Sequence, residues 1–414
     1  MLKIGNQNIS SVFLGSGKIT KGYVGEALVF DTLPMYTLTL SATPSGTGSV
    51  TGSGKYPAGS PVTAKATPYS GYSFTNWQKG TAVVSTSASY TFNIAENTTL
   101  KASFSVKPIG TWTDTNTTPS SGACKSMAYG GGRFVVIALG TAATKTAMYS
   151  ADGITWTAST LPENANNWNS VAYGYNKFVA IAGQKAAYSS DGATWTALSL
   201  PLESTVTKCV LVAYGGGRFV VIAQPNTSVT NDVFYSTNGT TWYTASQGNP
   251  STYYNREWID FIYGNGKFVA ISSSAVGYST SGTSWNFYKI SDANVGISTM
   301  KSIAYGGGYY VLISGGSSNK AAYSTDGINW TAATLPSTGN WSKVIYGGGK
   351  FLAVQGGNSS TSTKTNKAAY STDGGKTWTA VTLSHSDYWN LLAYGGGKFV
   401  AISQYSTKGS YTND

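Results

Sequence analysis

Short runs of alternating apolar and polar residues recur through most of the chain, and each run ends in a tight turn. In one unit, NSVAYG (169–174) predicts a strand that ends in a glycine turn. KFVAIAG (177–183) and KAAYS (185–189) predict a second and a third strand, and SSDGATW (189–195) predicts a turn whose tryptophan opens a fourth. Helical periodicity is absent, so we predict an all-β protein.

The same four-strand unit occurs seven times. Each copy carries a Tyr-Gly turn, and successive turn tyrosines lie 41 to 49 residues apart. A period of this length with four short strands per unit is typical of a β-propeller, so we predict seven blades. The turn tyrosines are Tyr129, Tyr173, Tyr214, Tyr263, Tyr305, Tyr346 and Tyr394.

The last unit is incomplete at the C-terminus. KGSYTND (408–414) aligns with the third strand and turn of the preceding unit, so its fourth strand is missing. GTWT (110–113) has the sequence of that strand and precedes the first unit. We therefore predict a propeller over residues 108–414, closed by a strand at 110–114 that completes the last blade and removes the exposed edges.

The turn before each fourth strand carries a polar side chain that can accept hydrogen bonds from backbone N–H groups of its own turn. The pattern S-x-D-G-x-T-W and its longer form STDGGKTW (371–378) resemble the Asp-boxes of sialidase-like β-propellers, over residues 110–414. The resemblance implies a fold and no activity, because sialidase chemistry needs an arginine cluster that Arg133, Arg218 and Arg256 do not supply. The acidic turn residues are Asp152, Asp191, Asp326, Asp373 and Asp414, with Asn238 and Ser281 at the same position in two other units.

Residues 36–106 carry a different set of motifs. They include a Gly-Ser-Val step, a Pro-x-Gly turn, a G-Y-x-F-x-x-W stretch that ends at Trp77, and a closing T-T-L-x-A-x-F. Together these motifs resemble the B-repeat of internalins and many bacterial surface proteins, which is a small β-grasp-like module. We assign residues 35–107 to this module, and the resemblance implies a spacer or a weak adhesion unit.

The first 33 residues form a short pseudo-repeat, in which IGNQNISSVFLGS is echoed by LGSGKITKGYVGE. A segment this short needs a partner surface or identical neighbours to bury its apolar residues. It resembles the N-termini of bacteriophage fibre and other virion accessory proteins. The resemblance implies that residues 1–34 anchor the chain to other virion proteins, that the chain is a homo-oligomer such as a trimer, and that it is made in the host cytoplasm and displayed on the virion surface.

Charged residues make up 10% of the chain, and the formal net charge of +11 is carried almost wholly by lysine. Scattered lysines indicate a solvated surface or attraction to polyanions such as acidic glycans and teichoic-type polymers. We expect no nucleic-acid partner, because the basic residues are not clustered and arginine is scarce. We expect no membrane insertion and no ordinary secretory signal, because no apolar run is long enough for either.

The carboxylates, the cysteines and the one histidine give no catalytic pattern. A glycosidase needs two carboxylates roughly 5 to 10 Å apart, and outside the turns only Glu257 and Asp260 fall close together. Three residues apart in one strand, they should point to opposite sides. His385 alone makes no metal cluster or triad, and the two cysteines, Cys124 and Cys209, lie two blades apart. We therefore expect no enzyme, no metal and no cofactor.

The connections between blades and between second and third strands vary in sequence, and both kinds must share the face opposite the glycine turns. We call this the loop face. Its longest connection (246–260) carries Tyr253, Tyr254 and Arg256 as candidate ligand contacts, and Tyr388 is another. Tryptophans five residues before a turn tyrosine either stack on a sugar ring or plug the gap between blades. These are Trp168, Trp258, Trp341 and Trp389.

We expect a phage virion accessory or fibre protein whose propeller binds a host-surface polysaccharide or glycoprotein, with glycan as the favoured ligand. Three alternatives stay open. The first is a structural head-fibre or capsid decoration protein without a receptor role. The second is a glycan-degrading enzyme whose active site lies on the loop face, and the third is a secreted bacterial adhesin.

Overall fold

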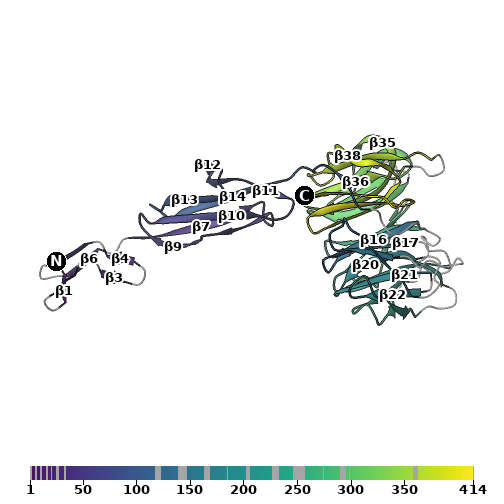
Figure 1. Cartoon of the computed structure of the whole chain (residues 1–414), viewed down its shortest axis with the longest axis horizontal. Coiled ribbons are helices and arrows are strands. Elements are labelled where there is room, and N and C mark those ends of the chain that lie inside the picture. The colour runs from purple at the N-terminus through teal and green to yellow at the C-terminus, as the bar shows by residue number, and fades with distance from the viewer. Residues whose placement is uncertain are drawn as a thin grey trace. The chain divides into compact units, whose positions relative to one another are not determined.

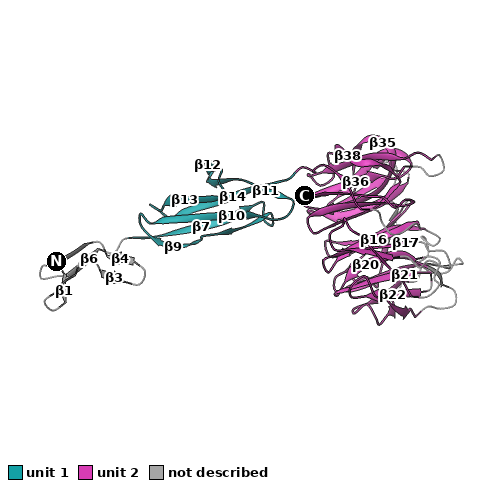
Figure 2. Cartoon of the chain, in the orientation of Figure 1, with its two compact units in different colours: residues 1–107 teal, residues 108–414 magenta. Residues whose placement is uncertain are grey.

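Two compact units make up the chain, residues 1–107 and residues 108–414 (Figure 2). Each element that the structure describes in full is a strand, and the prediction of an all-β protein with a propeller and an N-terminal module is confirmed. The computed structural model describes residues 2–4, 7–9, 12–14, 17–19, 21–24, 28–31, 34–116, 123–138, 147–162, 168–183, 185–201, 206–225, 233–245, 257–273, 275–289, 295–297, 299–357 and 362–413.

Three short antiparallel hairpins open the chain (Figure 1). Each strand has only three or four residues, so a single hairpin offers too little apolar surface to be stable alone. The pairs are β1 (Leu2–Ile4) with β2 (Gln7–Ile9), β3 (Val12–Leu14) with β4 (Gly17–Ile19), and β5 (Lys21–Val24) with β6 (Leu28–Asp31).

The module that follows contains two sheets. In sheet order, the larger one is β12 (Ala82–Ser85), β11 (Tyr72–Lys79), β14 (Thr98–Val106), β7 (Met35–Thr43) and β9 (Gly54–Pro57), with β14 parallel to β7. The smaller sheet is β13 (Ser89–Asn93), β10 (Pro61–Pro68) and β8 (Gly48–Thr51). Alternate residues of β10, namely Val62, Ala64 and Ala66, are buried and share one core with Trp77 of the larger sheet.

Seven four-stranded antiparallel blades form the C-terminal unit (Figure 1). Blade 1 comprises β16 (Cys124–Gly130), β17 (Arg133–Ala138), β18 (Ala147–Ser150) and β19 (Thr157–Ser159). Blade 2 comprises β20 (Trp168–Gly174), β21 (Lys177–Ala182), β22 (Lys185–Ser189) and β23 (Thr196–Ser199). Blade 3 comprises β24 (Val206–Gly215), β25 (Arg218–Pro225), β26 (Val233–Ser236) and β27 (Tyr243–Thr244). Blade 4 comprises β28 (Trp258–Gly264), β29 (Lys267–Ser272), β30 (Ala275–Ser279) and β31 (Asn286–Lys289).

Blades 5 and 6 share one long strand, β35 (Thr331–Gly347), whose first part ends blade 5 and whose second part begins blade 6. The other strands of blade 5 are β32 (Met300–Gly306), β33 (Tyr309–Ser314) and β34 (Ser317–Ser324). Those of blade 6 are β36 (Lys350–Gln355), β37 (Thr365–Ser371) and β38 (Thr379–Asp387).

Blade 7 joins the two ends of the unit. The C-terminus supplies β39 (Trp389–Gly395), β40 (Lys398–Ser403) and β41 (Gly409–Asn413), and β15 (Thr113–Asp114) adds the fourth strand. Asp114 pairs with Ser410 across this last ladder. The inner strands β39 and β16 are neighbours, so the ring of blades is closed.

The Tyr-Gly turn explains why this dipeptide recurs in every blade. The ring of each turn tyrosine lies against the first turn glycine of the preceding blade, so a Cβ on Gly130 would overlap the ring of Tyr173. The same contact joins blade 7 to blade 1, where a Cβ on Gly395 would overlap the ring of Tyr129. Glycine is required here because only a hydrogen fits beneath the ring. The inner strands of neighbouring blades are thereby packed together through the same contact at each junction.

The turn before each fourth strand is held by one side-chain acceptor. In blade 1, Asp152 Oδ1 accepts hydrogen bonds from the N–H groups of Ile154 and Thr155, each at 2.8 Å. Asn238 Oδ1 and Ser281 Oγ accept the equivalent pairs in their own turns, so the turn needs an acceptor and not a charge. Asp191, Asp326 and Asp373 bind in the same way, and Asp414 lies outside the described residues.

Candidate functional site

The tryptophans considered as ligand contacts are buried. Trp168, Trp258, Trp341 and Trp389 are between 0 and 7% exposed. Trp168, for example, packs with Val135 and Ile137 of the preceding blade. The structure thus places all four rings between blades, where none presents a face to a ligand at the surface.

Other predicted positions fall in two groups. Tyr253, Tyr254 and Arg256 lie outside the described residues. Cys124 and Cys209 are buried and form no disulfide.

Tyr388 is brought together with three residues that the sequence analysis did not select. Its ring lies 5.8 Å from the ring of Tyr405, at an interplanar angle of 81°, and Lys364 Nζ stands 5.5 Å from its centroid. Lys408 follows Tyr405 in the same β40–β41 connection and is exposed. We call Tyr388, Tyr405, Lys364 and Lys408 the rim patch. All four lie in connections of the loop face: Lys364 within blade 6, Tyr388 between blades 6 and 7, and Tyr405 and Lys408 within blade 7.

Tyr405 distinguishes this patch from the rest of the described surface. It is 50% exposed, and the other exposed large apolar side chains of the described propeller are Tyr175 and Tyr243. Tyr175 lies in a glycine turn and Tyr243 directly follows the turn before a fourth strand, so both are at the opposite face. The available signal in the sequence was an aromatic residue within a connection of the loop face, QYSTK (404–408), which is the criterion that selected Tyr253 and Tyr254.

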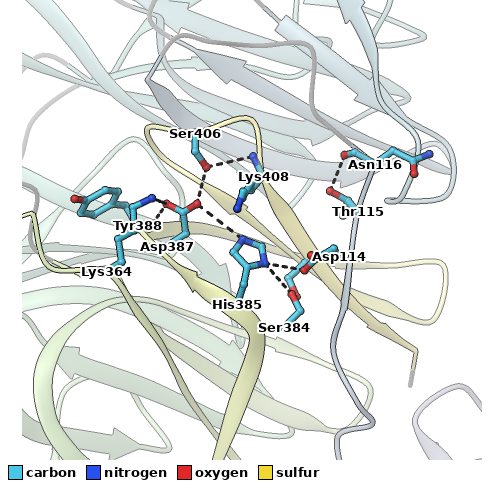
Figure 3. A network of polar contacts seen from close by, with 11 residues as sticks. Asp114, Thr115, Asn116, Lys364, Ser384, His385, Asp387, Tyr388, Ser406 and Lys408 are labelled. Carbon is cyan, nitrogen blue, oxygen red and sulfur yellow. Dashed lines mark hydrogen bonds and ion pairs between the residues drawn. The ribbon is translucent and has the colours of Figure 1, made fainter.

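The buried carboxylate of Asp387 contacts residues in and beside the rim patch. Asp387 accepts hydrogen bonds from the Tyr388 N–H at 2.9 Å and from Ser406 Oγ at 2.7 Å, and Lys364 Nζ lies 3.6 Å away (Figure 3). Burial raises the pKa of Asp387, but these hydrogen bonds and the charge of Lys364 outweigh it and hold the pKa below its usual value. Asp387 is therefore an anion that orders the backbone and side chains of the patch.

His385 lies between two carboxylates beside this patch (Figure 3). Its Nδ1 is 2.7 Å from Asp114 Oδ1 and 3.1 Å from Ser384 Oγ, and its Nε2 is 3.9 Å from Asp387 Oδ2. The hydrogen bond from Ser384, together with His385, holds the pKa of Asp114 below its usual value. Because Asp114 belongs to β15, this contact also ties the closing strand to blade 6.

The His385 cluster has the residue types of a catalytic triad but not its geometry. A triad places the nucleophile and the orienting carboxylate on opposite nitrogens of the imidazole. Here Ser384 and Asp114 both approach Nδ1. Asp387 Oδ2 stands 3.9 Å from Nε2, which is beyond hydrogen-bond distance, so no carboxylate orients the ring from the nitrogen opposite Ser384. Among the described residues, no group of three or more His, Cys, Asp or Glu side chains is placed to hold a metal ion.

A second candidate site lies on the propeller axis. A cavity of about 550 Å³ is lined by the inner strands of blades 1 to 6, and an adjoining one of about 160 Å³ by those of blades 1, 4, 5, 6 and 7. Each inner strand contains a β-bulge just after the position five before its turn tyrosine. The bulge changes which side chains of the strand reach the axis.

The bulge corrects the expectation for Glu257 and Asp260. In blade 4 it makes Ile259 an extra residue, so the alternation of sides shifts by one. Glu257 and Asp260 therefore both line the axial cavity, instead of pointing to opposite sides. Asp260 accepts hydrogen bonds from Ser302 Oγ at 2.7 Å and from Lys343 Nζ at 2.8 Å. These bonds link blade 4 to blades 5 and 6.

Comparisons with known proteins support the two-part architecture. Residues 38–108 match the family described as the divergent InlB B-repeat domain, which confirms the resemblance of this module. A search of curated protein sequences finds no match. Within the described residues, no helix combines the length and apolar character needed to cross a membrane.

Solved propeller structures resemble the C-terminal unit at low sequence identity. Virginiamycin B lyase from Staphylococcus aureus is 11% identical, with a TM-score of 0.58 over 73% of this chain and 99% of that one. YCF48 from Cyanidioschyzon merolae is 13% identical, with a TM-score of 0.54 over 73% and 98%. The Pan2 WD40 domain from Neurospora crassa is 7% identical, with a TM-score of 0.54 over 74% and 97%. At such identities the likeness shows the fold alone, and the fold does not decide whether this chain is an enzyme.

Proposed function

We propose that this chain is a bacteriophage fibre or virion accessory protein whose propeller binds a glycan on the host surface. The rim patch carries the proposal. An exposed ring at Tyr405, a second ring at Tyr388 and two lysine ammonium groups form one surface on the face built from variable connections. Aromatic faces stack on the C–H surfaces of sugar rings, while lysines contact hydroxyl and acidic groups.

The order of the modules supports a role in attachment. Three hairpins too small to fold alone precede a B-repeat module, and the propeller follows at the C-terminal end. Such an order fits an anchor that associates with other virion proteins, a spacer and a binding head. Immunogold labelling of phage particles with an antibody against the propeller tests the virion assignment. Labelling at tail tips supports receptor binding, labelling on the capsid supports a decoration role, and particles without label contradict the assignment.

The rim patch gives a direct test of glycan binding. We expect the full chain to bind host cells and a subset of glycans on an array, and Tyr405→Ala to weaken this binding about tenfold, which corresponds to ~1.4 kcal/mol. Loss of the ring removes its stacking surface while the fold is kept, because half of the side chain is already in water.

Tyr243→Ala is the matched control for that experiment. Tyr243 is 51% exposed against 50% for Tyr405, and it lies away from the loop face. Equal binding by the two variants would contradict a role for the rim patch. If the wild-type chain binds neither host cells nor glycans, a structural role in the particle is the better explanation. Release of reducing ends from host polysaccharide would favour an enzyme.

A further inference from the structure

His385 is the one histidine of the chain, and its two ring nitrogens face two different carboxylates. Nδ1 lies 2.7 Å from Asp114 Oδ1, and Nε2 lies 3.9 Å from Asp387 Oδ2 (Figure 3). Asp114 belongs to β15, the strand that closes the ring of blades, and Asp387 ends β38 of blade 6. The imidazole therefore stands between the closing strand and the carboxylate that orders the rim patch.

The neutral ring makes one of these contacts and leaves the other unmade. Asp114 and Asp387 are anions at neutral pH, so each can only accept a hydrogen bond. The hydrogen of a neutral imidazole is therefore assigned to Nδ1, where Asp114 is within hydrogen-bond distance. Nε2 is then a bare acceptor that faces another acceptor, and it is buried without a hydrogen-bond partner among the described residues.

A second proton turns Nε2 into a donor aimed at Asp387. An imidazolium carries an N–H group on both nitrogens, so each would face a carboxylate. The distance of 3.9 Å is about 1 Å longer than a hydrogen bond, which a small rotation of the ring closes. The side chain of Asp387 is 0% exposed and that of His385 is 18% exposed, so water screens their attraction only weakly.

The charges around the ring do not oppose this proton. Two acidic and two basic side chains from four elements lie around it: Asp114 of β15, Asp387 of β38, Lys364 of the β36–β37 connection and Lys408 of the β40–β41 connection. The acids face the imidazole nitrogens, whereas Lys364 lies against the other oxygen of Asp387 and Lys408 acts on Asp114. The uncharged Trp389 of β39 packs on the ring, and Ser410 of β41 bonds to Ser384.

We propose that His385 is a pH-sensitive switch that links ring closure to the rim patch. Protonation adds a charge-assisted hydrogen bond from Nε2 to Asp387, while the bond from Nδ1 to the closing strand is kept. One imidazolium then holds both β15 and the end of β38. Because Asp387 also accepts hydrogen bonds from Ser406 and from the Tyr388 N–H, the same proton holds the rim patch more firmly. The switch does not depend on what the rim patch binds.

Nitrogen NMR of the full chain labelled with ¹⁵N-histidine reads the switch directly, because a single residue carries the label. We expect the proton on Nδ1 at pH 8 and protons on both nitrogens at pH 5.5. Asp114→Asn should reach the doubly protonated ring only about one pH unit lower, since one neighbouring anion is lost. Glu96→Gln is the matched control, because it removes a carboxylate of similar exposure, 65% against 63%, from the other unit.

Three results of this titration would overturn the proposal. They are a proton on Nε2 in place of Nδ1 at pH 8, a ring that is still singly protonated at pH 5.5, and identical titrations of Asp114→Asn and Glu96→Gln.

Thermal melts of the full chain test the link to ring closure. A proton that is bound more tightly in the folded than in the unfolded chain stabilises the fold as the pH falls. Between pH 8 and pH 5.5 we expect wild type to gain about 2–4 °C in melting temperature over His385→Gln, the size expected for one charge-assisted hydrogen bond. The gain should be lost as the pH falls below about 3.9, where the carboxylates take up protons. A constant difference between the two chains from pH 8 to pH 5.5 would contradict the switch.

Discussion

At the scale of single residues, the Asp260–Lys343 pair stands out because it links blades that are far apart in the sequence. The side chain of Asp260 is 11% exposed and that of Lys343 is 29% exposed. Ser302 continues the link, since its hydroxyl donates to Asp260 and accepts from the Val344 N–H at 3.2 Å. A nearly buried carboxylate is costly without its counter-ion, so this pair fixes the spacing of blades 4, 5 and 6.

We expect Lys343→Met to lower the free energy of unfolding by about 1–3 kcal/mol, below the range for fully buried pairs because Lys343 is partly exposed. Urea unfolding followed by tryptophan fluorescence measures the change. The double variant Asp260→Asn/Lys343→Met should recover part of the loss, because no unpaired charge remains. Lys320→Met removes an exposed lysine from β34 and is the control. If Lys343→Met is as stable as Lys320→Met, the pair is not stabilising.

The same residues show where sequence patterns stop being informative. Alternation placed Glu257 and Asp260 on opposite sides of a strand, and the bulge at Ile259 reversed that parity. A bulge of this kind leaves no mark in the order of apolar and polar residues. Trp168 and Trp389 posed a different problem, because packing between blades and stacking on sugars select the same side chain. Only their burial separates the two roles.

At the scale of the element, the turn before each fourth strand links sequence, hydrogen bonding and pH dependence. Burial raises the pKa of Asp326, but the N–H groups of Asn329 and Ile328 and the hydroxyl of Ser324 outweigh it and hold the pKa well below its usual value. A depressed folded-state pKa stabilises the protein above the unfolded value of about 3.9. That contribution is lost as the pH falls below 3.9 toward the folded pKa.

We expect Asp326→Asn to unfold at nearly the wild-type temperature at pH 7, because Asn238 supplies the same two backbone hydrogen bonds in blade 3. Between pH 4 and pH 2 the variant should lose less stability than wild type, since it has no charge to neutralise. Thermal melts across this range measure the difference, with Asp326→Ala as the variant that lacks the acceptor. Parallel acid profiles for wild type and Asp326→Asn would contradict this explanation.

At the scale of the whole molecule, the repeat predicted more than the individual residues did. The spacing of seven Tyr-Gly turns predicted the propeller, since each tyrosine packs on the glycine of the preceding blade. The motifs around Trp77 predicted the B-repeat module. The pairing of Asp260 with Lys343 was not predicted, because the two residues belong to blades 4 and 6 and lie 83 positions apart in the sequence. The variable connection that holds Tyr253 and Tyr254 lies outside the described residues.

Ring closure gives the last prediction, because a single short strand joins the two ends of the propeller. Upstream of β15, Trp112 is 5% exposed and packs with Leu352, Val354 and Phe399 of blades 6 and 7. A chain of residues 116–414 loses both this ring and the partner of β41. We expect it to melt well below a chain of residues 108–414 and to self-associate through the open edge of β41.

Calorimetry and light scattering on the two truncated chains measure these effects. Trp112→Ala in the longer chain is the control, since it removes the ring but keeps the strand. It should lower stability by roughly 3–5 kcal/mol without causing self-association, because the edge of β41 stays paired. Equal melting temperatures for the two truncated chains would mean that the blade is stable with three strands. The contact between Asp114 and His385 would then not be needed for ring closure. A large difference between the two melting temperatures would indicate that this contact contributes to closure.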